Sequence, residues 1–195
     1  MSNSLPNNNT TLGTCGVLVV GAGPAGIAAA LTLQEAGHDV LVIDKAHFPR
    51  DKCCGDGLTT GALRVLEELG FDPSTVANWT PCSDVWLRSP SGKEMQMMLP
   101  TGQGQFAAIA PRIELDDALV QLAKSRGIRV MEGHGFVDVK QHTNDHIDVE
   151  IEHLGTIRAQ YVVAADGMWS PVRKALGVST PGYLGEWHAF RQYAN

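Results

Sequence analysis

The stretch that decides the fold is Val17-Leu-Val-Val-Gly21-Ala-Gly23-Pro24-Ala25-Gly26, which continues into an Ala- and Leu-rich segment up to residue 36. Residues 17–20 form a short apolar run, which predicts a buried strand, and the apolar spacing of 24–36 predicts a helix. A second apolar run at 39–43 predicts another strand. Such a βαβ unit requires parallel strands and a right-handed crossover. We therefore expect an α/β fold with a parallel sheet.

The glycines in this stretch are typical of a loop that receives phosphate groups. Gly21 permits a tight turn, Gly23 lets a pyrophosphate approach the backbone, and Gly26 lets the helix pack closely on the sheet. The helix begins at Pro24 and Ala25, so its first amides and its positive dipole end would face the phosphates. The pattern predicts a dinucleotide site, and an ordinary strand-turn-helix is the less favoured alternative.

An acidic residue closes the second predicted strand. Asp44 lies 18 residues after Gly26, where its carboxylate can accept hydrogen bonds from an adenosine ribose. A 2′-phosphate would be repelled there, which makes NADP the least favoured occupant of the site.

Composition excludes several classes of protein. The 195 residues are 44% hydrophobic and 18% charged, so they can bury a core, and neither disorder nor a coiled coil describes the whole chain. A net charge of -6 argues against binding to nucleic acid. No basic residue precedes Lys45, as a secretory signal would require, and the four cysteines do not make a disulfide framework. These features predict a soluble protein of the reducing cytoplasm.

The rest of the chain alternates helical and strand patterns. The polar residues 1–14 are expected to be a mobile tail. Helices are expected at 60–69 and 113–125, and a hairpin at 84–89 and 93–99 around a Ser-Pro-Ser-Gly turn. Further short strands are expected at 129–131, 137–140, 147–152, 156–159 and 161–164.

A second cofactor signal follows the last of these strands. Asp166 and Gly167 come directly after a buried apolar run, at the edge of an α/β sheet where ligands bind. A carboxylate there can bind the hydroxyls of a sugar-like group such as the ribityl chain of a flavin. The alternative is that Asp166 caps a helix that starts near Ser170.

Together, the two signals resemble the flavoprotein monooxygenase and reductase superfamily, whose fold is shared with the aromatic hydroxylases. The resemblance implies FAD as the cofactor. It also implies that Arg112, in Ala110-Pro-Arg112-Ile-Glu, contacts the FAD pyrophosphate region. By the same resemblance, the backbone of the strand at Phe136 is expected to lie against the adenine. A solvated arginine at a helix start is the alternative for Arg112, although a cation is mildly unfavourable there.

The loop Phe48-Pro-Arg50-Asp-Lys52-Cys53-Cys54-Gly55-Asp56-Gly57-Leu is similar to a characteristic loop of the geranylgeranyl reductase family. Physically, it is a Gly-rich loop with cations and a thiol, suited to an anionic or polar cofactor. By resemblance, Cys54 lies near the flavin and the substrate, as a proton donor or as a group that shapes the site, and a structural thiol is the alternative. The cofactor contacts expected here are Lys45, Arg50, Lys52, Gly55, Asp56 and Gly57.

The family resemblance implies a reductase that saturates isolated double bonds in polyprenyl chains. Hydride would pass from the flavin N5 to one alkene carbon, and a proton would reach the other. The implied substrate is a polyprenyl lipid or a prenylated quinone, and the implied electron donor is NADPH or reduced ferredoxin. Peripheral membrane contact is expected only because such substrates are lipids, since no amphipathic anchor is visible. No metal site is expected, because the histidines lack ligand spacing.

Two other functions remain open. One is a flavin monooxygenase or halogenase on the same scaffold, and the other is a non-catalytic FAD-binding fragment. A disulfide reductase is disfavoured, since the chain lacks a Cys-x4-Cys pair and a second nucleotide loop. We expect the FAD-binding domain at 15–80 and 105–180, and the first strands of an incomplete antiparallel substrate-domain sheet at 81–104 and 181–195. A missing C-terminal segment or a partner chain would then complete the enzyme.

Overall fold

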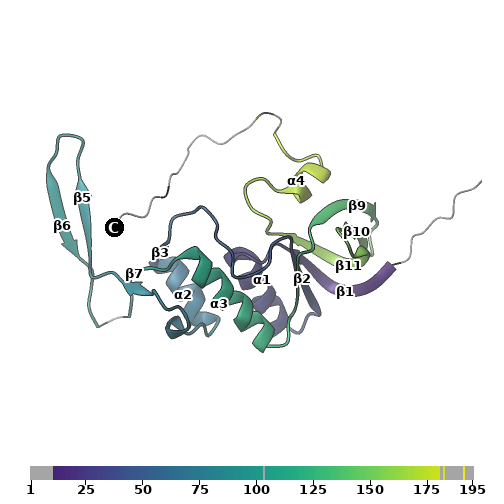
Figure 1. Cartoon of the computed structure of the whole chain (residues 1–195), viewed down its shortest axis with the longest axis horizontal. Helices are drawn as coiled ribbons and strands as arrows, with labels where there is room; N and C mark the ends of the chain where they lie inside the picture. Colours follow the sequence, from purple (N-terminus) through teal and green to yellow (C-terminus); the bar gives the residue numbers. More distant parts are fainter. Residues whose placement is uncertain (1–10, 103, 181, 183–190, 192–195) are drawn as a thin grey trace, which may run out of the picture. The chain divides into compact units, whose positions relative to one another are not determined.

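The computed structural model describes residues 11–102, 104–180, 182 and 191, and Figure 1 shows their elements. By backbone contacts the chain divides into two compact units, residues 1–48 with 123–183 and residues 49–122 with 184–195. The predicted domain boundaries at 80, 105 and 180 differ from this division. Each unit is described by itself below.

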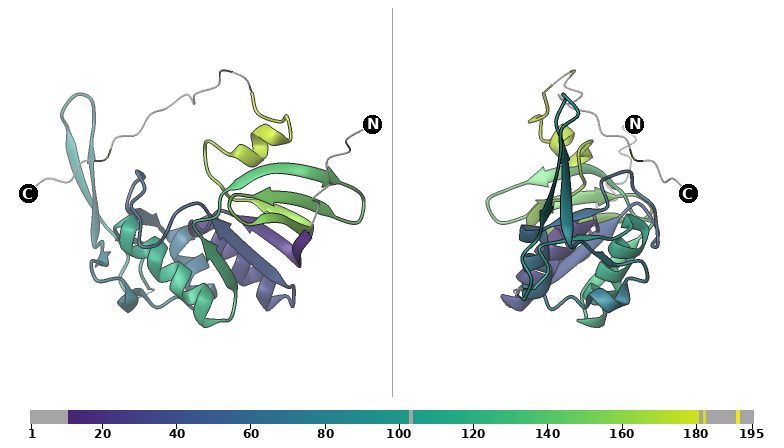
Figure 2. Two further views of the ribbon diagram at one scale, coloured as in Figure 1. Left: turned by 45° about the vertical axis from the view of Figure 1, so that its right-hand side comes forward. Right: turned by 90° about the vertical axis from the view of Figure 1, so that its left-hand side faces the viewer.

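A six-stranded sheet forms the first unit, in the order β8-β2-β1-β11-β10-β9. Strands β8, β2, β1 and β11 are parallel, and β10 and β9 continue the sheet in antiparallel pairing (Figure 2). This arrangement confirms the predicted α/β fold with a mostly parallel sheet. The strand bounds are β1 Thr11–Val20, β2 Val40–Asp44, β8 Arg129–Glu132, β9 Phe136–His142, β10 Ile147–Ile151 and β11 Gly155–Ala164.

Both faces of the central strands are buried. Side chains alternate along a strand, so Leu18 and Val20 share one face of β1 while Val17 and Val19 occupy the other, and all four are at most 4% exposed. Helix α1 (Pro24–Glu35) contacts β1, β2 and β11, and helix α4 (Pro171–Ala175) contacts β9. Val172 of α4 joins the core cluster that contains Leu18 and Val20. Burial on two faces explains why these strands read as continuous apolar runs.

The second unit combines helices with two small antiparallel sheets. Its three-stranded sheet has the order β3-β7-β4, and β5 and β6 form a separate hairpin. Helix α3 (Arg112–Ser125) begins in this unit and ends past the division. The other elements are β3 Gly57–Thr59, α2 Thr60–Glu68, a 3-10 helix at Pro73–Thr75, β4 Thr80–Pro81, β5 Asp84–Arg88, β6 Glu94–Met98 and β7 Ala107–Ile109.

Local signals place the two long helices of this unit. Thr59 caps α2, because its hydroxyl accepts a hydrogen bond from the amide of Ala62, and Gly70 follows the helix with a φ of 64°. Gly127 lies just beyond α3 with a φ of 83°. The predicted hairpin is confirmed, and Figure 2 shows β5 and β6 as a ribbon that extends from the rest of their unit.

Two expectations differ from the structure. Strand β1 begins at Thr11, before the predicted end of the tail at residue 14, because Thr11–Cys15 pair with Thr156–Ala159 of β11. The strands expected at 156–159 and 161–164 are one strand, β11, since β1 pairs with residues on both sides of the expected break.

Residues 1–10 and nearly all of the predicted strand 181–195 lie outside the described residues. No helix in the described part of the chain is both long and apolar enough to cross a membrane.

Candidate cofactor and thiol sites

The loop between β1 and α1 requires glycine at two positions. Gly21 has a φ of 105°, and a Cβ there would lie 2.4 Å from the carbonyl oxygen of Ala165. A Cβ on Gly26 would lie 1.8 Å from the carbonyl oxygen of Gly21, so the helix passes directly over the turn. These contacts show why the turn and the helix can approach each other only without side chains.

The N-terminus of α1 suits an anionic ligand. Gly23 is the N-cap, and no side chain caps the helix there. The first residue, Pro24, has no amide hydrogen, and the next amides belong to Ala25 and Gly26, within the first turn, where helix geometry provides no acceptor. Such amides and the helix dipole favour a phosphate. The predicted phosphate-loop residues are therefore brought together, and this loop fits the pyrophosphate of a dinucleotide.

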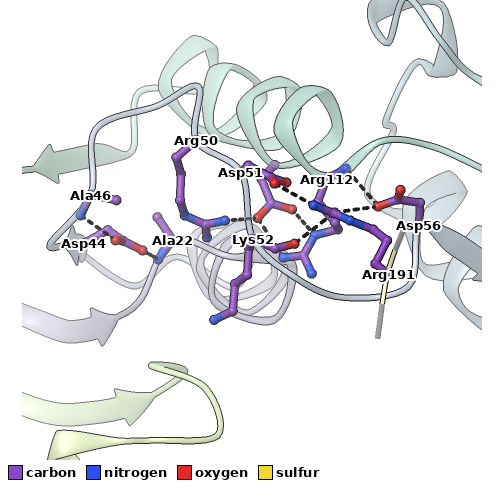
Figure 3. A network of polar contacts seen from close by, with 10 residues as sticks. Ala22, Asp44, Ala46, Arg50, Asp51, Lys52, Asp56, Arg112 and Arg191 are labelled. Atoms are coloured by element: carbon purple, nitrogen blue, oxygen red, sulfur yellow. Dashed lines mark hydrogen bonds and ion pairs between the residues drawn. The ribbon is translucent and has the colours of Figure 1, made fainter. Parts of the chain in front are cut away.

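Asp44 fastens the same loop to the end of β2. Its Oδ2 accepts a hydrogen bond from the amide of Ala22 at 2.8 Å, and its Oδ1 accepts one from the amide of Ala46 at 2.9 Å (Figure 3). Each carboxylate oxygen can accept further hydrogen bonds. This carboxylate can therefore accept hydrogen bonds from ribose hydroxyls while it orients the loop. The neighbouring predicted contact, Lys45, is exposed.

Asp166 and Gly167 lie just beyond the end of β11, beside the phosphate loop. The amide of Ala165 donates to the carbonyl of Val20 at 2.8 Å, which joins the two strand ends. Ser170 is the N-cap of α4, and the Asp166 Oδ2 also accepts a hydrogen bond from an amide of the first turn of this helix, that of Val172, at 3.0 Å. A contact between Asp166 and a flavin ribityl chain stays a prediction.

Phe136, the predicted adenine neighbour, begins β9 and packs partly buried against the core. The segment before it contacts the end of β2, since the amide of His134 donates to the carbonyl of Asp44 at 2.9 Å. Sequence reasoning thus selected a segment that is attached to the end of β2, and the adenine contact stays a prediction.

In the second unit, a fully buried carboxylate joins two predicted cofactor-binding arginines. Asp116 is 0% exposed, and its two oxygens accept hydrogen bonds from Nε and Nη2 of Arg112, both at 2.7 Å. Nη1 of Arg50 donates to Oδ2 of the same carboxylate at 2.8 Å. Hydrogen bonding to Asp116 raises the pKa of Arg112. Arg112 is therefore a fixed, partly buried cation rather than a solvated residue at a helix start.

The thiol loop, residues 50–57, carries the remaining predicted site residues. Lys52, Cys54, Gly55 and Gly57 are exposed, whereas Asp56 is partly buried. Cys54 contributes, after the larger effect of Asp116, to the raised pKa of Arg112, so its thiol lies near this guanidinium. Cys54, which the resemblance placed near the flavin, thus lies in a loop that is hydrogen-bonded through Asp56 to the amide of Arg112.

Sequence reasoning missed two residues of this unit. Asp116 lies four residues after Arg112 on α3, and this helical spacing could have indicated an ion pair. Arg191 donates hydrogen bonds to the thiol loop (Figure 3), and no local pattern in the sequence indicates this contact. The structure therefore adds one carboxylate, that of Asp116, and one guanidinium, that of Arg191, to the residues predicted around the thiol loop.

Other reactive groups support no second chemistry. Cys15 is buried in β1, and burial raises the pKa of its thiol to about 11, which makes it a poor nucleophile. Within residues 11–102, 104–180, 182 and 191, no cluster of three or more His, Cys, Asp or Glu side chains could hold a metal ion.

Comparison with protein families gives one match over most of the chain, to the FAD binding domain family over residues 14–191. The menaquinone reductase of Mycolicibacterium smegmatis is 40% identical over 167 residues, which cover 83% of this chain and 39% of the relative. The rifampicin monooxygenase of Rhodococcus hoagii is 29% identical over 163 residues, which cover 84% and 34%. This chain therefore spans about two fifths or less of the length of these curated relatives.

A solved structure described as geranylgeranyl bacteriochlorophyll reductase-like, from Thermoplasma acidophilum, superimposes with a TM-score of 0.70 and 26% identity. The match covers 84% of this chain and 42% of that one. Digeranylgeranylglycerophospholipid reductases and a flavin-dependent halogenase are also among the similar proteins. Reductases and oxygen-using enzymes thus share this fold.

Proposed function

Because the chain belongs to the FAD binding domain family, we propose that it binds FAD and serves a flavin-dependent reductase that acts on the polyprenyl chain of a quinone or lipid. The phosphate loop carries this proposal: glycines 21 and 26 bring the turn against the uncapped start of α1, and Asp44 holds the loop amide of Ala22. These are the groups that a pyrophosphate and an adenosine ribose require.

The residues of the first unit would bind and orient the cofactor. The amides at the start of α1 would bind the pyrophosphate, and the carboxylate of Asp44 would accept the ribose hydroxyls. When FAD is bound and reduced, it supplies a hydride from its N5. The electron donor proposed for this step is NADPH or reduced ferredoxin.

The thiol loop of the second unit would supply the proton that the reduction requires. Reduction of an isolated double bond needs a proton as well as a hydride, and Cys54 carries an exposed thiol near the guanidinium of Arg112. We assign Cys54 the delivery of that proton or the shaping of the alkene site. The reductase is preferred over other flavin chemistry because a menaquinone reductase is 40% identical to this chain and because the thiol loop resembles that of the geranylgeranyl reductases.

A flavin monooxygenase is the second candidate, favoured by the similarity to the rifampicin monooxygenase. It would use the same phosphate loop but would need no proton donor beside an alkene. Oxygen consumption with peroxide formation or hydroxylation of an aromatic compound would favour this candidate.

The test begins with the purified 195-residue chain and a titration with FAD, followed by absorbance and fluorescence. A chain that neither retains nor titrates FAD contradicts the proposal. With FAD bound and dithionite as reductant, loss of one double bond from a menaquinone, measured by mass spectrometry, supports the reductase. Cys54→Ser should keep FAD binding and slow this reduction, whereas Cys82→Ser, outside the thiol loop, should change neither. FAD binding without reduction would restrict this chain to cofactor binding.

A further inference from the structure

Arg191 makes three contacts to the thiol loop from a distant position in the chain. Its Nη2 donates a hydrogen bond to Oδ2 of Asp51 at 2.5 Å, and its Nη1 lies 3.2 Å from the carbonyl oxygen of Lys52 and 3.3 Å from Oδ1 of Asp56 (Figure 3). All of these residues belong to the second unit. The Arg191 side chain is 16% exposed, so it packs against the loop rather than extending into solvent.

Asp56 extends these contacts to the start of α3. The same Oδ1 that faces Arg191 accepts a hydrogen bond from the amide of Arg112 at 3.3 Å, and the carbonyl of Asp56 accepts one from the amide of Ala110 at 2.9 Å. The Asp56 side chain is 9% exposed. Arg191 and the first residue of α3 therefore share one carboxylate oxygen.

The charges of the loop make this contact specific for a cation. Asp51 and Asp56 place two carboxylates on a short loop, and hydrogen bonding to Arg191, aided by a smaller effect of Arg112, lowers the pKa of Asp51. The guanidinium of Arg112 already forms two hydrogen bonds with Asp116. Arg191 thus places its guanidinium beside two carboxylates of the loop, while the guanidinium of Arg112 binds Asp116.

A Gly-rich loop without such contacts would sample many conformations. Gly55 is exposed and has open space where a side chain would begin, so no side-chain packing restricts it, whereas Gly57 is held by pairing with Ile109 as the first residue of β3. Cys54 lies between Lys52, whose carbonyl Arg191 binds, and Asp56, whose carboxylate Arg191 binds. Contacts on both sides of the thiol restrict where it can lie.

We propose that Arg191 is a positioning residue that holds the thiol loop, and with it Cys54, in its conformation against the start of α3. This inference rests on the proposed function, because that function makes Cys54 and Arg112 parts of the reaction site. Arg191 itself needs no contact with cofactor or substrate. It acts by ordering the loop before ligands bind, which reduces the entropy lost on binding.

The experiment compares Arg191→Met and Arg191→Lys in the full chain, with Arg88→Met as the matched control. Arg88 lies in the same unit and forms an exposed ion pair with Glu94 at 3.5 Å. Hydrogen exchange followed by mass spectrometry reports the opening of residues 50–57, and near-ultraviolet circular dichroism shows that each variant is folded. We expect Arg191→Met to speed exchange in this segment about 10-fold, as loss of charge-assisted hydrogen bonds predicts. Arg191→Lys should restore part of the protection, and Arg88→Met should match the original chain.

A coupled variant separates positioning from a general loss of stability. In an Asp51→Asn background, Arg191→Met should have a smaller effect on loop exchange than in the original chain, because one of its partners is already neutral. The affinity for FAD should fall about 5-fold in Arg191→Met and recover in part with Arg191→Lys.

The outcomes distinguish this inference from the function on which it rests. If the original chain binds FAD but Arg191→Met leaves both loop exchange and FAD affinity unchanged, the positioning role is wrong. Equal effects of Arg191→Met with and without Asp51→Asn would also overturn it. If the original chain binds no FAD while the loop still opens in Arg191→Met, the proposed function fails and the loop contact remains. Should Arg191→Met fail to fold, Arg191→Lys and Arg191→Gln carry the same comparison.

Discussion

Asp116 and Arg112 form a two-bond ion pair within one helix, with both oxygens of the buried carboxylate 2.7 Å from guanidinium nitrogens. The Arg112 side chain is only 11% exposed, and Arg50, which binds the same carboxylate, is 17% exposed. One acid therefore fixes the two arginines that the family resemblance assigned to the cofactor.

Replacing Asp116 should destabilise the protein strongly. Asp116→Asn keeps the shape of the side chain but leaves two poorly exposed guanidinium groups without their carboxylate, and breaking one partner of a buried pair costs about 3 kcal/mol. The free energy of unfolding from urea titration measures the change. Asp117→Asn is the control, because Asp117 only accepts one hydrogen bond from Gln121 at 3.1 Å, and a change within about 0.5 kcal/mol is expected. Similar values for the two variants would contradict the buried pair.

The phosphate loop should not accept a side chain at Gly26. A Cβ there lies 1.8 Å from the carbonyl oxygen of Gly21, so Gly26→Ala must displace backbone, which we expect to cost about 3 kcal/mol and to abolish FAD binding. Gly61→Ala is the matched control, since a Cβ at that position in α2 meets open space. Its stability should stay the same or rise by less than about 1 kcal/mol. Urea titration and FAD fluorescence test both, and a folded Gly26→Ala chain with normal FAD affinity would refute the close contact.

Asp44 should govern affinity for the adenosine end of the cofactor. Asp44→Ala removes the acceptor for the amides of Ala22 and Ala46 and the acceptor proposed for the ribose, so the Kd for FAD should rise at least about 10-fold. Asp39→Asn, just before the same strand, breaks an exposed ion pair with Arg129 and should leave the Kd unchanged. Fluorescence titration gives both constants. An unchanged Kd for Asp44→Ala would exclude the ribose contact.

Acid should weaken the sheet through Asp148. This buried carboxylate accepts hydrogen bonds from Nε and Nη2 of Arg158, both at 2.7 Å, and hydrogen bonding to Arg158 lowers its pKa. Because the pKa is lower in the folded chain than in the unfolded chain, the stabilisation is complete above the ordinary carboxyl value near 4 and is lost as the pH falls through the folded value.

Stability of the original chain and of Asp148→Asn, measured between pH 6 and about pH 3, tests this dependence. The variant should be less stable at pH 6, and its stability should fall less on acidification. Asp138→Asn, an exposed change on β9, should follow the original chain. Parallel pH profiles for the original chain and Asp148→Asn would show that the ion pair does not stabilise the fold.

Much of the first unit could be predicted because its signals are local. The apolar run of β1, the helical spacing of α1 and the acid at the end of β2 follow one another within about thirty residues, which is the length of a βαβ unit. The strand break expected near residue 160 was wrong because continuous pairing with β1 is not visible in the periodicity of β11. For Asp166, the sequence left a cofactor contact and a helix cap as alternatives; the structure shows a hydrogen bond from the first turn of α4, and the cofactor contact stays a prediction.

The sequence by itself determined the α/β fold, the phosphate loop and the identity of the thiol loop, because turns, helix starts and strand ends depend on residues close together in the chain. Only the tertiary structure decided what holds Arg50 and Arg112, since their shared partner Asp116 meets Arg50 across 66 residues of sequence. It likewise brought Arg191 to Asp51 over a separation of 140 residues. Such pairings depend on how segments pack against one another, and no local spacing in the sequence encodes that packing.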